Sequence, residues 1–277
     1  GRRYDLAINF EGDIRSHVLL GLSGAARRVG FDMAGGGPML TDRVGFDASV
    51  HTRVASLTLV ERAFDLPAGS LARKSRDESA GPPLRIPEDA RERASRLIEP
   101  FRAPGAPVVA LHVSGGREIK QWHLDRFGEA ASRLAALHGA RILFTGSPDD
   151  RPLIDAVRRS LAPSVPVLDV AGQVDVVTLA ALLDEVDLLV TADTGPMHLA
   201  ATLGVPIVAI FGPSDPARWG PLSNQAEVVR VQLPCSPCNR IRQPPARCRG
   251  HVPDCLAEVT VEQVLSKAEA LLHRRHR

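Results

Sequence analysis

From Pro107 onward, short apolar runs alternate with longer segments that have helical spacing. The apolar runs are rich in Val, Ile and Leu, which is typical of strands buried on both faces of a sheet. They are Val108–Val113, Arg141–Phe144, Val167–Val170, Asp187–Thr191 and Ile207–Phe211. The intervening segments carry an apolar residue every three or four positions and predict helices. These helices are Leu124–Leu137, Asp150–Leu161, Val176–Leu183 and Met197–Leu203. The alternation predicts an α/β fold with a parallel, doubly wound sheet and right-handed connections.

The N-terminal part shows a weaker version of the same pattern. Tyr4–Phe10 and Arg28–Phe31 predict strands, and Ser16–Ala25 between them has helical spacing. Further along, His51–Phe64 carries an apolar stripe and Pro87–Leu97 is a charged segment, and both predict helices. These elements predict part of a second α/β layer.

The composition of the connecting segments suggests where the domains divide. Polar, Gly and Pro residues dominate residues 67–87, which predicts a mobile loop, and Pro100–Pro107 predicts a linker. We therefore expect a partial N-terminal Rossmann-like domain over residues 1–104 and a C-terminal Rossmann-like domain over residues 105–277. The first is expected to be incomplete, with a segment missing upstream, because the opening strand reads as an interior one and no Met precedes it.

Composition and charge limit the classes of function. Apolar residues make up 44% of the chain but aromatic residues only 4%, so the core must consist mainly of Leu, Val, Ile and Ala. The net charge of +2 offers no electrostatic reason to expect a nucleic-acid partner. No apolar run approaches the ~20 residues that cross a bilayer, and no signal peptide is visible, so we predict a cytoplasmic protein. The basic end His273–Arg277 is either solvated or in contact with an anionic membrane surface.

Five predicted strands end in turns that combine Gly with a small polar residue or Gln. The turns are Ser114-Gly115-Gly116, Thr145-Gly146-Ser147, Gly172-Gln173, Asp193-Thr194-Gly195 and Gly212-Pro213-Ser214. The carboxyl ends of parallel strands lie at one edge of the sheet, where doubly wound folds bind ligands. We therefore predict a ligand-binding face along this edge.

The turn at Asp193 has the character of an anion site. Pro196 stands in the first turn of the following helix, where its missing N–H costs nothing. The remaining N–H groups at a helix start attract anions, Thr194 adds a hydroxyl, and His198 adds an imidazole one turn further on. A phosphorylated ligand is expected here, with His198 either bonding a phosphate oxygen or packing beneath the turn. Because a carboxylate repels phosphate, Asp193 is expected to orient the turn, cap the helix or bond sugar hydroxyls.

Two further charged positions follow neighbouring strands. Lys120 precedes a predicted helix and is either a surface lysine or a group that neutralises a phosphate. Asp149 and Asp150 open the next helix. Acids there stabilise the helix dipole, and one can also bond the ribose hydroxyls of a nucleotide.

All the cysteines of the chain lie in the segment 235–255. They form a Cys-x2-Cys-x9-Cys-x6-Cys pattern of Cys235, Cys238, Cys248 and Cys255. Four thiols this close in a cytosolic protein favour a tetrahedral structural zinc site over disulfides. Free thiols packed in a loop are the alternative, and a zinc ion with four sulfur ligands would not be catalytic.

These motifs resemble glycosyltransferase family 9, the heptosyltransferases that add heptose from ADP-heptose to lipopolysaccharide core. The most specific matches are Asp193–Ala201, Phe211–Pro216 and the cysteines from Cys235 to Cys255. The resemblance covers most of residues 4–265. It implies a GT-B fold, with two Rossmann-like domains and parallel sheets, the acceptor on the N-terminal domain and the nucleotide-sugar donor on the C-terminal one. It also implies inverting transfer by direct displacement, with no catalytic metal or other catalytic cofactor.

The resemblance also implies roles for residues of the donor site. Ser114, Gly115 and Lys120 would contact the diphosphate, although many relatives carry Thr or Gly-Ala pairs where this chain has Ser114-Gly115. The carboxylate of Asp150 would bond the adenosine ribose, and the backbone of Val174 would hold the adenine.

The remaining implied residues surround the transferred sugar and the phosphates. They are Asp193, Thr194, Gly195 and His198. Among all these groups, Lys120 and His198 would stabilise the charge that grows on the leaving diphosphate.

The catalytic base is not assigned within this chain. Family members begin with a strand and a Gly-Asp loop whose carboxylate deprotonates the acceptor hydroxyl. Gly12-Asp13 is not given this role, because its surroundings match a later Asp-Leu-Gln-Gly element of the family. The base is expected upstream, so this chain should bind donor but catalyse poorly.

Other functions remain open at this point. The chain could be a GT-B transferase for a UDP or GDP sugar, a non-catalytic nucleotide-sugar-binding fragment, or a zinc-stapled interaction protein. As a family 9 enzyme it would act peripherally at the inner-membrane surface on a lipid-linked oligosaccharide acceptor. We expect a monomer.

Overall fold

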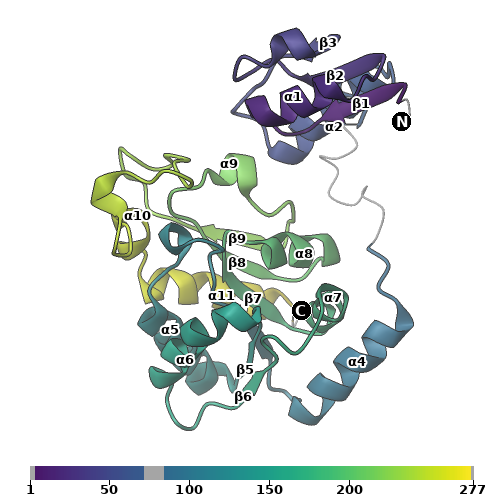
Figure 1. The fold of residues 1–277 in the computed structure, drawn as a ribbon. Helices are drawn as coiled ribbons and strands as arrows, with labels where there is room; N and C mark the ends of the chain where they lie inside the picture. The colour runs from purple at the N-terminus through teal and green to yellow at the C-terminus, as the bar shows by residue number, and fades with distance from the viewer. Residues whose placement is uncertain (1–3, 72–83, 276–277) are drawn as a thin grey trace. The chain divides into compact units, whose positions relative to one another are not determined.

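The computed structural model describes residues 4–71 and 84–275 and divides the chain into two compact units (Figure 1). The boundary between the units falls between Pro82 and Pro83. Each unit has its own parallel sheet and its own hydrophobic core. Of the predicted mobile loop at 67–87, residues 72–83 lie outside the described residues, so that prediction stays open.

The first unit is a three-stranded parallel sheet with the strand order β1-β2-β3. Its elements are β1 (Leu6–Asn9), α1 (Ile14–Leu22), β2 (Arg27–Phe31), β3 (Asp42–Val44) and α2 (Thr52–Ala63). Val29 and Phe31 of β2 pack against Ala55 and Leu59 of α2. Strand β3 was not predicted, because three residues with two charged side chains contain no apolar run.

The second unit contains six parallel strands in the order β6-β5-β4-β7-β8-β9. They are β4 (Val108–His112), β5 (Arg141–Phe144), β6 (Val167–Asp169), β7 (Leu188–Ala192), β8 (Ile207–Ile210) and β9 (Ala226–Val229). Counted from β4, the spatial order is 3-2-1-4-5-6, as in dinucleotide-binding folds. The predicted parallel, doubly wound sheet is confirmed. The edge strand β9 was missed, since its four residues Ala-Glu-Val-Val contain only two consecutive strand-forming residues.

Helices cover both faces of this sheet (Figure 1). One face carries α5 (Leu124–His138), α6 (Arg151–Arg159) and α11 (Val261–Arg275). The other carries α4 (Glu88–Ile98), α7 (Val176–Asp184) and α8 (Gly195–Leu203). Alternate residues of each strand serve the two cores: Val109 and Leu111 face the first set, and Val108 and Ala110 face the second.

Shorter helical turns lie in the loops of both units. They are the 3-10 turns Gly37–Met39, Glu99–Phe101, Glu118–Lys120, Pro148–Asp150 and Ala246–Cys248, and the short helices α9 (Pro216–Trp219) and α10 (Asp254–Ala257). Two of these turns, Glu118–Lys120 and Pro148–Asp150, follow β4 and β5 directly and belong to the sheet edge described below.

Helix α4 belongs to the second unit by its contacts. Ala90, Ala94 and Ile98 are buried in the core that α7 shares, and Arg91 Nη1 lies 2.7 Å from Asp184 Oδ2 at the end of α7. The small alanine face allows the two helices to approach closely. The predicted domain boundary at residues 104 and 105 instead grouped this helix with the first sheet.

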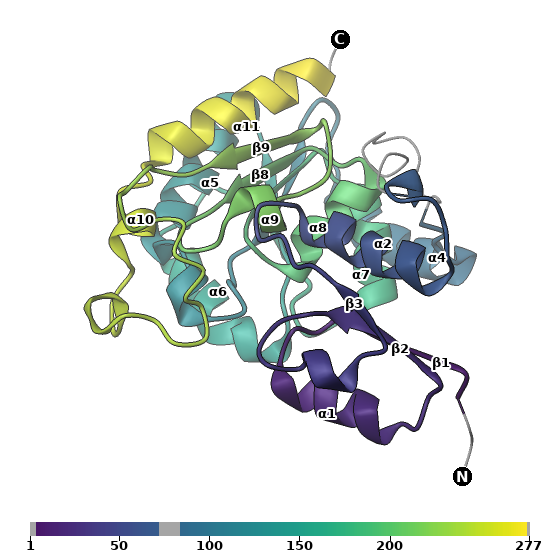
Figure 2. The same cartoon turned by 90° about the horizontal axis from the view of Figure 1, so that it is seen from above.

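The C-terminal helix α11 lies beside β8 and β9 (Figure 2). Its residues Leu271 and Leu272 are buried, and Arg274 Nη2 is 2.9 Å from Glu227 Oε1 on β9. Of the basic end His273–Arg277, the described side chains of His273 and Arg274 are exposed at the end of α11, so the prediction that this end is solvated or contacts a membrane stays open. Across residues 4–71 and 84–275, no helix combines the length and apolarity needed to span a bilayer.

Candidate functional site

Two cavities of about 780 Å³ each open at the carboxyl edge of the second sheet. The first, the β5-side cavity, is lined by residues that follow β4, β5 and β6, together with Pro196 of α8. The second, the β8-side cavity, is lined by residues that follow β4, β7, β8 and β9. Strands β4 and β7 are the neighbours at which the direction of winding reverses, the position where such sheets bind ligands. The predicted ligand face therefore contains two cavities of ligand size.

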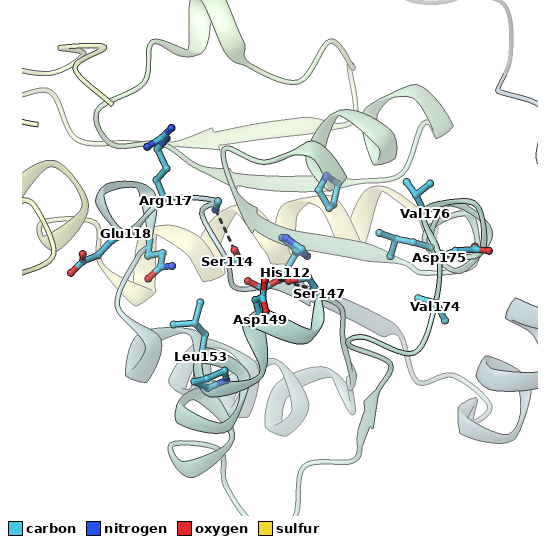
Figure 3. A pocket seen from close by; sticks show the side chains of 17 residues that line it. His112, Ser114, Arg117, Glu118, Ser147, Asp149, Leu153, Val174, Asp175 and Val176 are labelled. Atoms are coloured by element: carbon cyan, nitrogen blue, oxygen red, sulfur yellow. Dashed lines mark hydrogen bonds between the residues drawn. The ribbon is translucent and has the colours of Figure 1, made fainter. Parts of the chain in front are cut away.

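A polar cluster forms one wall of the β5-side cavity (Figure 3). His112, the last residue of β4, is 8% exposed, and its Nδ1 lies 3.1 Å from Thr145 Oγ1. Burial disfavours the imidazolium and lowers the pKa of His112, and the charge of Asp150 opposes this only in part. Sequence reasoning missed His112 because it lies within a predicted strand.

Asp150 is held in place by Ser147. The backbone N–H and the hydroxyl of Ser147 both donate to Asp150 Oδ2, at 2.7 and 2.8 Å, as part of a capping box around the 3-10 turn Pro148–Asp150 that precedes α6. Burial raises the pKa of Asp150, but hydrogen bonds from Ser147 and Ser114 outweigh burial, so the net pKa lies below its ordinary value. Asp150 is thus ionised at neutral pH and completes the capping box of this turn while lining the cavity.

The opposite wall of this cavity is largely apolar. Figure 3 shows Val174 and Val176 on the side away from Arg117, whereas Leu153 lies on the side of Glu118. The side chain of Asp175 between the two valines caps α7 by accepting from the amide of Thr178 at 2.7 Å. A polar wall facing an apolar one suits a ligand with a flat apolar ring and a hydroxyl-bearing part.

An ion pair between Lys120 and Asp193 lines the β8-side cavity. Lys120 Nζ donates to Asp193 Oδ2 at 3.1 Å and to the Asp193 carbonyl oxygen at 2.6 Å. The two side chains are 18% and 13% exposed. Because Lys120 compensates the carboxylate, the predicted repulsion between Asp193 and a nearby phosphate is weakened. An ammonium has three donors, so one remains for a ligand.

The residue at the N-cap position of α8 is Thr194, not Asp193. The Thr194 side chain makes no capping hydrogen bond, and its Oγ1 lies 3.1 Å from Thr191 Oγ1. A Cβ added to Gly195 would meet nothing within 4 Å, so the first turn opens onto free space. His198 is half-buried and lines neither of the two cavities.

Gly115 has a packing role that differs from the predicted diphosphate contact. A Cβ at this position would lie 2.6 Å from the carbonyl carbon of Lys120. Glycine therefore allows the loop after β4 to pack against the turn Glu118–Lys120, which positions the lysine. Gly115 lines neither cavity, whereas the predicted residues Ser114, Asp150 and Val174 line the first.

The four cysteines line a third cavity of about 350 Å³. Burial, followed by the charges of Cys238, Cys248 and Cys235, raises the pKa of the Cys255 thiol to about 11. In the part of the chain that the structure describes, no group of three or more His, Cys, Asp or Glu is arranged to hold a metal ion. The predicted structural zinc site is therefore not supported, and the alternative of free thiols packed in a loop fits these contacts.

Asp13 serves as a helix cap in the first unit. It accepts from the amides of Arg15 and Ser16 at 2.9 and 3.1 Å, and the Ser16 bond chiefly lowers the pKa of Asp13. A carboxylate stabilised in its ionised form is a weak base.

Sequence reasoning also missed three arginines at the cavities. Arg117 lines both cavities, and Arg240 and Arg242 line the β8-side cavity. The last two come from the cysteine-rich segment, far along the chain from β7. In the sequence, nothing marked these two arginines as site residues except their positive charge in a segment without apolar periodicity.

The second unit is thus a Rossmann-like domain with its ligand cavities at the switch point of the sheet. The family model of "Glycosyltransferase family 9 (heptosyltransferase)" matches residues 1–247 of the chain. The chain belongs to this family.

Curated relatives are similar over part of their length. The chain is 28% identical over 158 residues to lipooligosaccharide heptosyltransferase 2 of Campylobacter jejuni, covering 57% of this chain and 48% of that protein. It is 30% identical over 112 residues to the lipopolysaccharide core heptosyltransferase OpsX of Haemophilus influenzae, covering 40% and 32%. The matched region thus spans about half or less of these relatives.

Solved structures show the same fold. Heptosyltransferase II of E. coli aligns with a TM-score of 0.71 at 21% identity, covering 99% of this chain and 78% of that one. The family 9 glycosyltransferase of Veillonella parvula aligns with a TM-score of 0.72 at 24% identity, covering 98% and 74%. The predicted GT-B fold class, with two Rossmann-like parallel sheets, is confirmed.

Proposed function

We propose that this chain is part of a glycosyltransferase that moves heptose from ADP-heptose to a lipopolysaccharide core acceptor. Transfer would invert the anomeric centre by direct displacement, without a catalytic metal. The observation that carries the proposal is the β5-side cavity, lined by the ionised Asp150, beside the Lys120–Asp193 pair at the switch point. The curated relatives are named as heptosyltransferases, and one solved relative is the E. coli heptosyltransferase WaaC with ADP.

The donor would lie across the two cavities. The adenine would pack near Val174, and Asp150 would accept hydrogen bonds from the ribose hydroxyls. The diphosphate would lie near Ser114 and the open first turn of α8, whose amides favour anions. With the donor in this orientation, the transferred sugar would lie beside Lys120 and Asp193.

The chemistry follows from charge movement. An acceptor hydroxyl oxygen attacks the anomeric carbon, the bond from that carbon to the diphosphate oxygen breaks on the opposite face, and a base takes the hydroxyl proton. Negative charge grows on the departing ADP, where Lys120 and the amides of α8 stabilise it more than in the bound donor. The base is proposed to lie outside this chain. The role predicted for His198, which lines neither cavity, stays a prediction.

Calorimetric titration of ADP, UDP and GDP tests the donor site. We expect ADP to bind most tightly, and Asp150→Asn to weaken ADP by about tenfold because a charged acceptor for the ribose is lost. Asp155→Asn is the matched control, since Asp155 is an exposed acid on α6, the helix that follows Asp150, and lines neither cavity.

The outcomes separate the alternatives. Absence of ADP binding would refute the proposal, and a preference for UDP or GDP would indicate another nucleotide sugar. ADP-heptose binding without transfer, in a protein that includes the expected upstream segment and receives a core-lipid acceptor, would indicate a non-catalytic binding module.

A further inference from the structure

The β8-side cavity is strongly cationic. Its charged lining consists of five basic side chains and one acid: Arg117, Lys120, Arg218, Arg240, Arg242 and Asp193. The single acid is already compensated by Lys120. The cavity therefore has a positive charge that its own carboxylate does not balance.

Three of the guanidinium groups are available to a ligand. Within residues 4–71 and 84–275, the side chains of Arg117, Arg240 and Arg242 make no hydrogen bond or ion pair. Their planar forks match the geometry of phosphate and carboxylate oxygens. Arg240 and Arg242 line only the β8-side cavity, where the proposed donor has its uncharged sugar and not its diphosphate, so the donor leaves them without an anion.

Backbone hydrogen bonds hold the segment that carries these two arginines. The amides of Cys238 and Asn239 donate to the carbonyl oxygen of Pro213, at 3.1 and 2.8 Å. The Ser236 hydroxyl donates to the Gly212 carbonyl oxygen at 2.7 Å, and Asn239 Oδ1 accepts from the Asp215 amide at 3.0 Å. The loop after β8 thus anchors the segment whose following residues, Arg240 and Arg242, line the cavity.

The rest of the lining suits a sugar. Trp219 lines the cavity with the Arg218 guanidinium over its ring, 5.2 Å from the centroid, so a sugar ring can pack only on the part of the indole that this arginine leaves uncovered. Gln243 has an amide that can both donate to and accept from hydroxyls. A concave site of about 780 Å³ fits a compact saccharide better than a flat membrane surface.

We propose that the β8-side cavity binds the acidic group, phosphate or carboxylate, of an anionic acceptor saccharide through Arg240 and Arg242. This inference rests on the proposed function, because the cavity contains the Lys120–Asp193 pair beside which the transferred sugar is placed. It gives the C-terminal unit a direct part in choosing the acceptor.

The test is a calorimetric titration of the protein saturated with ADP. Glucose 6-phosphate and glucuronate serve as phosphate and carboxylate probes, and glucose is the neutral comparison. We expect at least one of the two anionic probes to bind and glucose not to bind. Arg240→Ala/Arg242→Ala should weaken the anionic probe by about tenfold, because charge-assisted bonds are lost, while the ADP affinity stays unchanged.

The double variant Arg96→Ala/Arg159→Ala is the control. It removes two exposed arginines of the same unit that line neither cavity, and it should bind as the unaltered protein does. Melting curves verify that both double variants fold.

Several results would overturn the inference. These are failure of both anionic probes to bind, equal binding of glucose, and unaltered probe binding by Arg240→Ala/Arg242→Ala. An equal loss of ADP affinity would instead assign the arginines to the donor. Loss of binding to anionic phospholipid vesicles with sugar binding intact would assign them to a membrane. If the unaltered protein fails to bind ADP, the proposed function fails, and the same titrations without ADP still decide the role of the arginines.

Discussion

Lys120 and Asp193 illustrate how one ion pair resolves an apparent conflict. A carboxylate at the end of β7 would repel a diphosphate bound at the start of α8. The ammonium of Lys120, 3.1 Å from Asp193 Oδ2, compensates that charge and still has a donor to spare. The sequence contained both residues, but their 73-residue separation concealed the pairing.

Lys120→Ala should lower turnover with ADP-heptose by at least about tenfold, since loss of one transition-state donor typically costs ~3 kcal/mol. Turnover is measured as ADP release, in a protein that includes the expected upstream segment. Lys267→Ala is the control, because Lys267 pairs with Glu227 on the surface, outside both cavities. Unchanged kinetics for Lys120→Ala would remove this lysine from the site.

A second variant separates two roles of the lysine. If Lys120 only neutralises Asp193, then Lys120→Ala/Asp193→Asn should recover the lost turnover. We expect the double variant to stay slow, because the diphosphate still lacks its cation.

At the scale of elements, Arg27 joins three parts of the first unit. From β2, its guanidinium donates to Asp65 at 2.7 Å and to Asp42 of β3 at 3.3 Å. It also donates to the carbonyl oxygens of Arg62 and Ala63 at the end of α2, at 2.8 and 2.9 Å. One side chain thereby connects β3, which the sequence pattern did not reveal, to the rest of the unit.

This network predicts a pH dependence of stability. The hydrogen bond from Arg27 chiefly lowers the pKa of Asp42 and of Asp65. A carboxyl whose pKa is lower when folded stabilises the folded state above pH ~4 and loses this effect as pH falls through the folded pKa. The melting temperature of the first unit should therefore fall between about pH 5 and pH 2.

Arg27→Ala should lower the neutral-pH melting temperature by roughly 5 °C and flatten this acid dependence. Arg53→Ala, an exposed arginine on α2, should change neither property. An acid dependence that persists in full after Arg27→Ala would show that other carboxyls cause it.

At the scale of the molecule, the second unit contributes all the residues that line the two cavities. Its two cores are formed by residues between Ile86 and Leu272, and both cavities are lined by residues between His112 and Gln243. The ligand contacts proposed for ADP thus all come from one folded unit.

Residues 83–277 by themselves should therefore fold and bind ADP with the affinity of the 277-residue chain. Cooperative melting verifies folding, and calorimetric titration compares the affinities. A folded second unit with much weaker ADP binding would show that the first unit contributes to the donor site.

The sequence could predict only those elements whose own residues have a characteristic apolar spacing. The long, buried strands of the second unit and its amphipathic helices were recognisable, because their apolar spacing is set by the sheet and helix periods. The short strands β3 and β9 lack that spacing and form by pairing with neighbours already in place. Helix α4 was recognised, but its attachment to α7 depends on contacts distant in sequence.

By itself, the sequence determined the doubly wound sheet and the edge at which ligands bind, because strand ends and glycine-containing turns are local features. Only the tertiary structure decided that Lys120 pairs with Asp193 and that Arg240 and Arg242 reach a cavity lined also by residues that follow other strands. These contacts join segments from different loops, so the charge and shape of the site exist only once the sheet has brought its strand ends together.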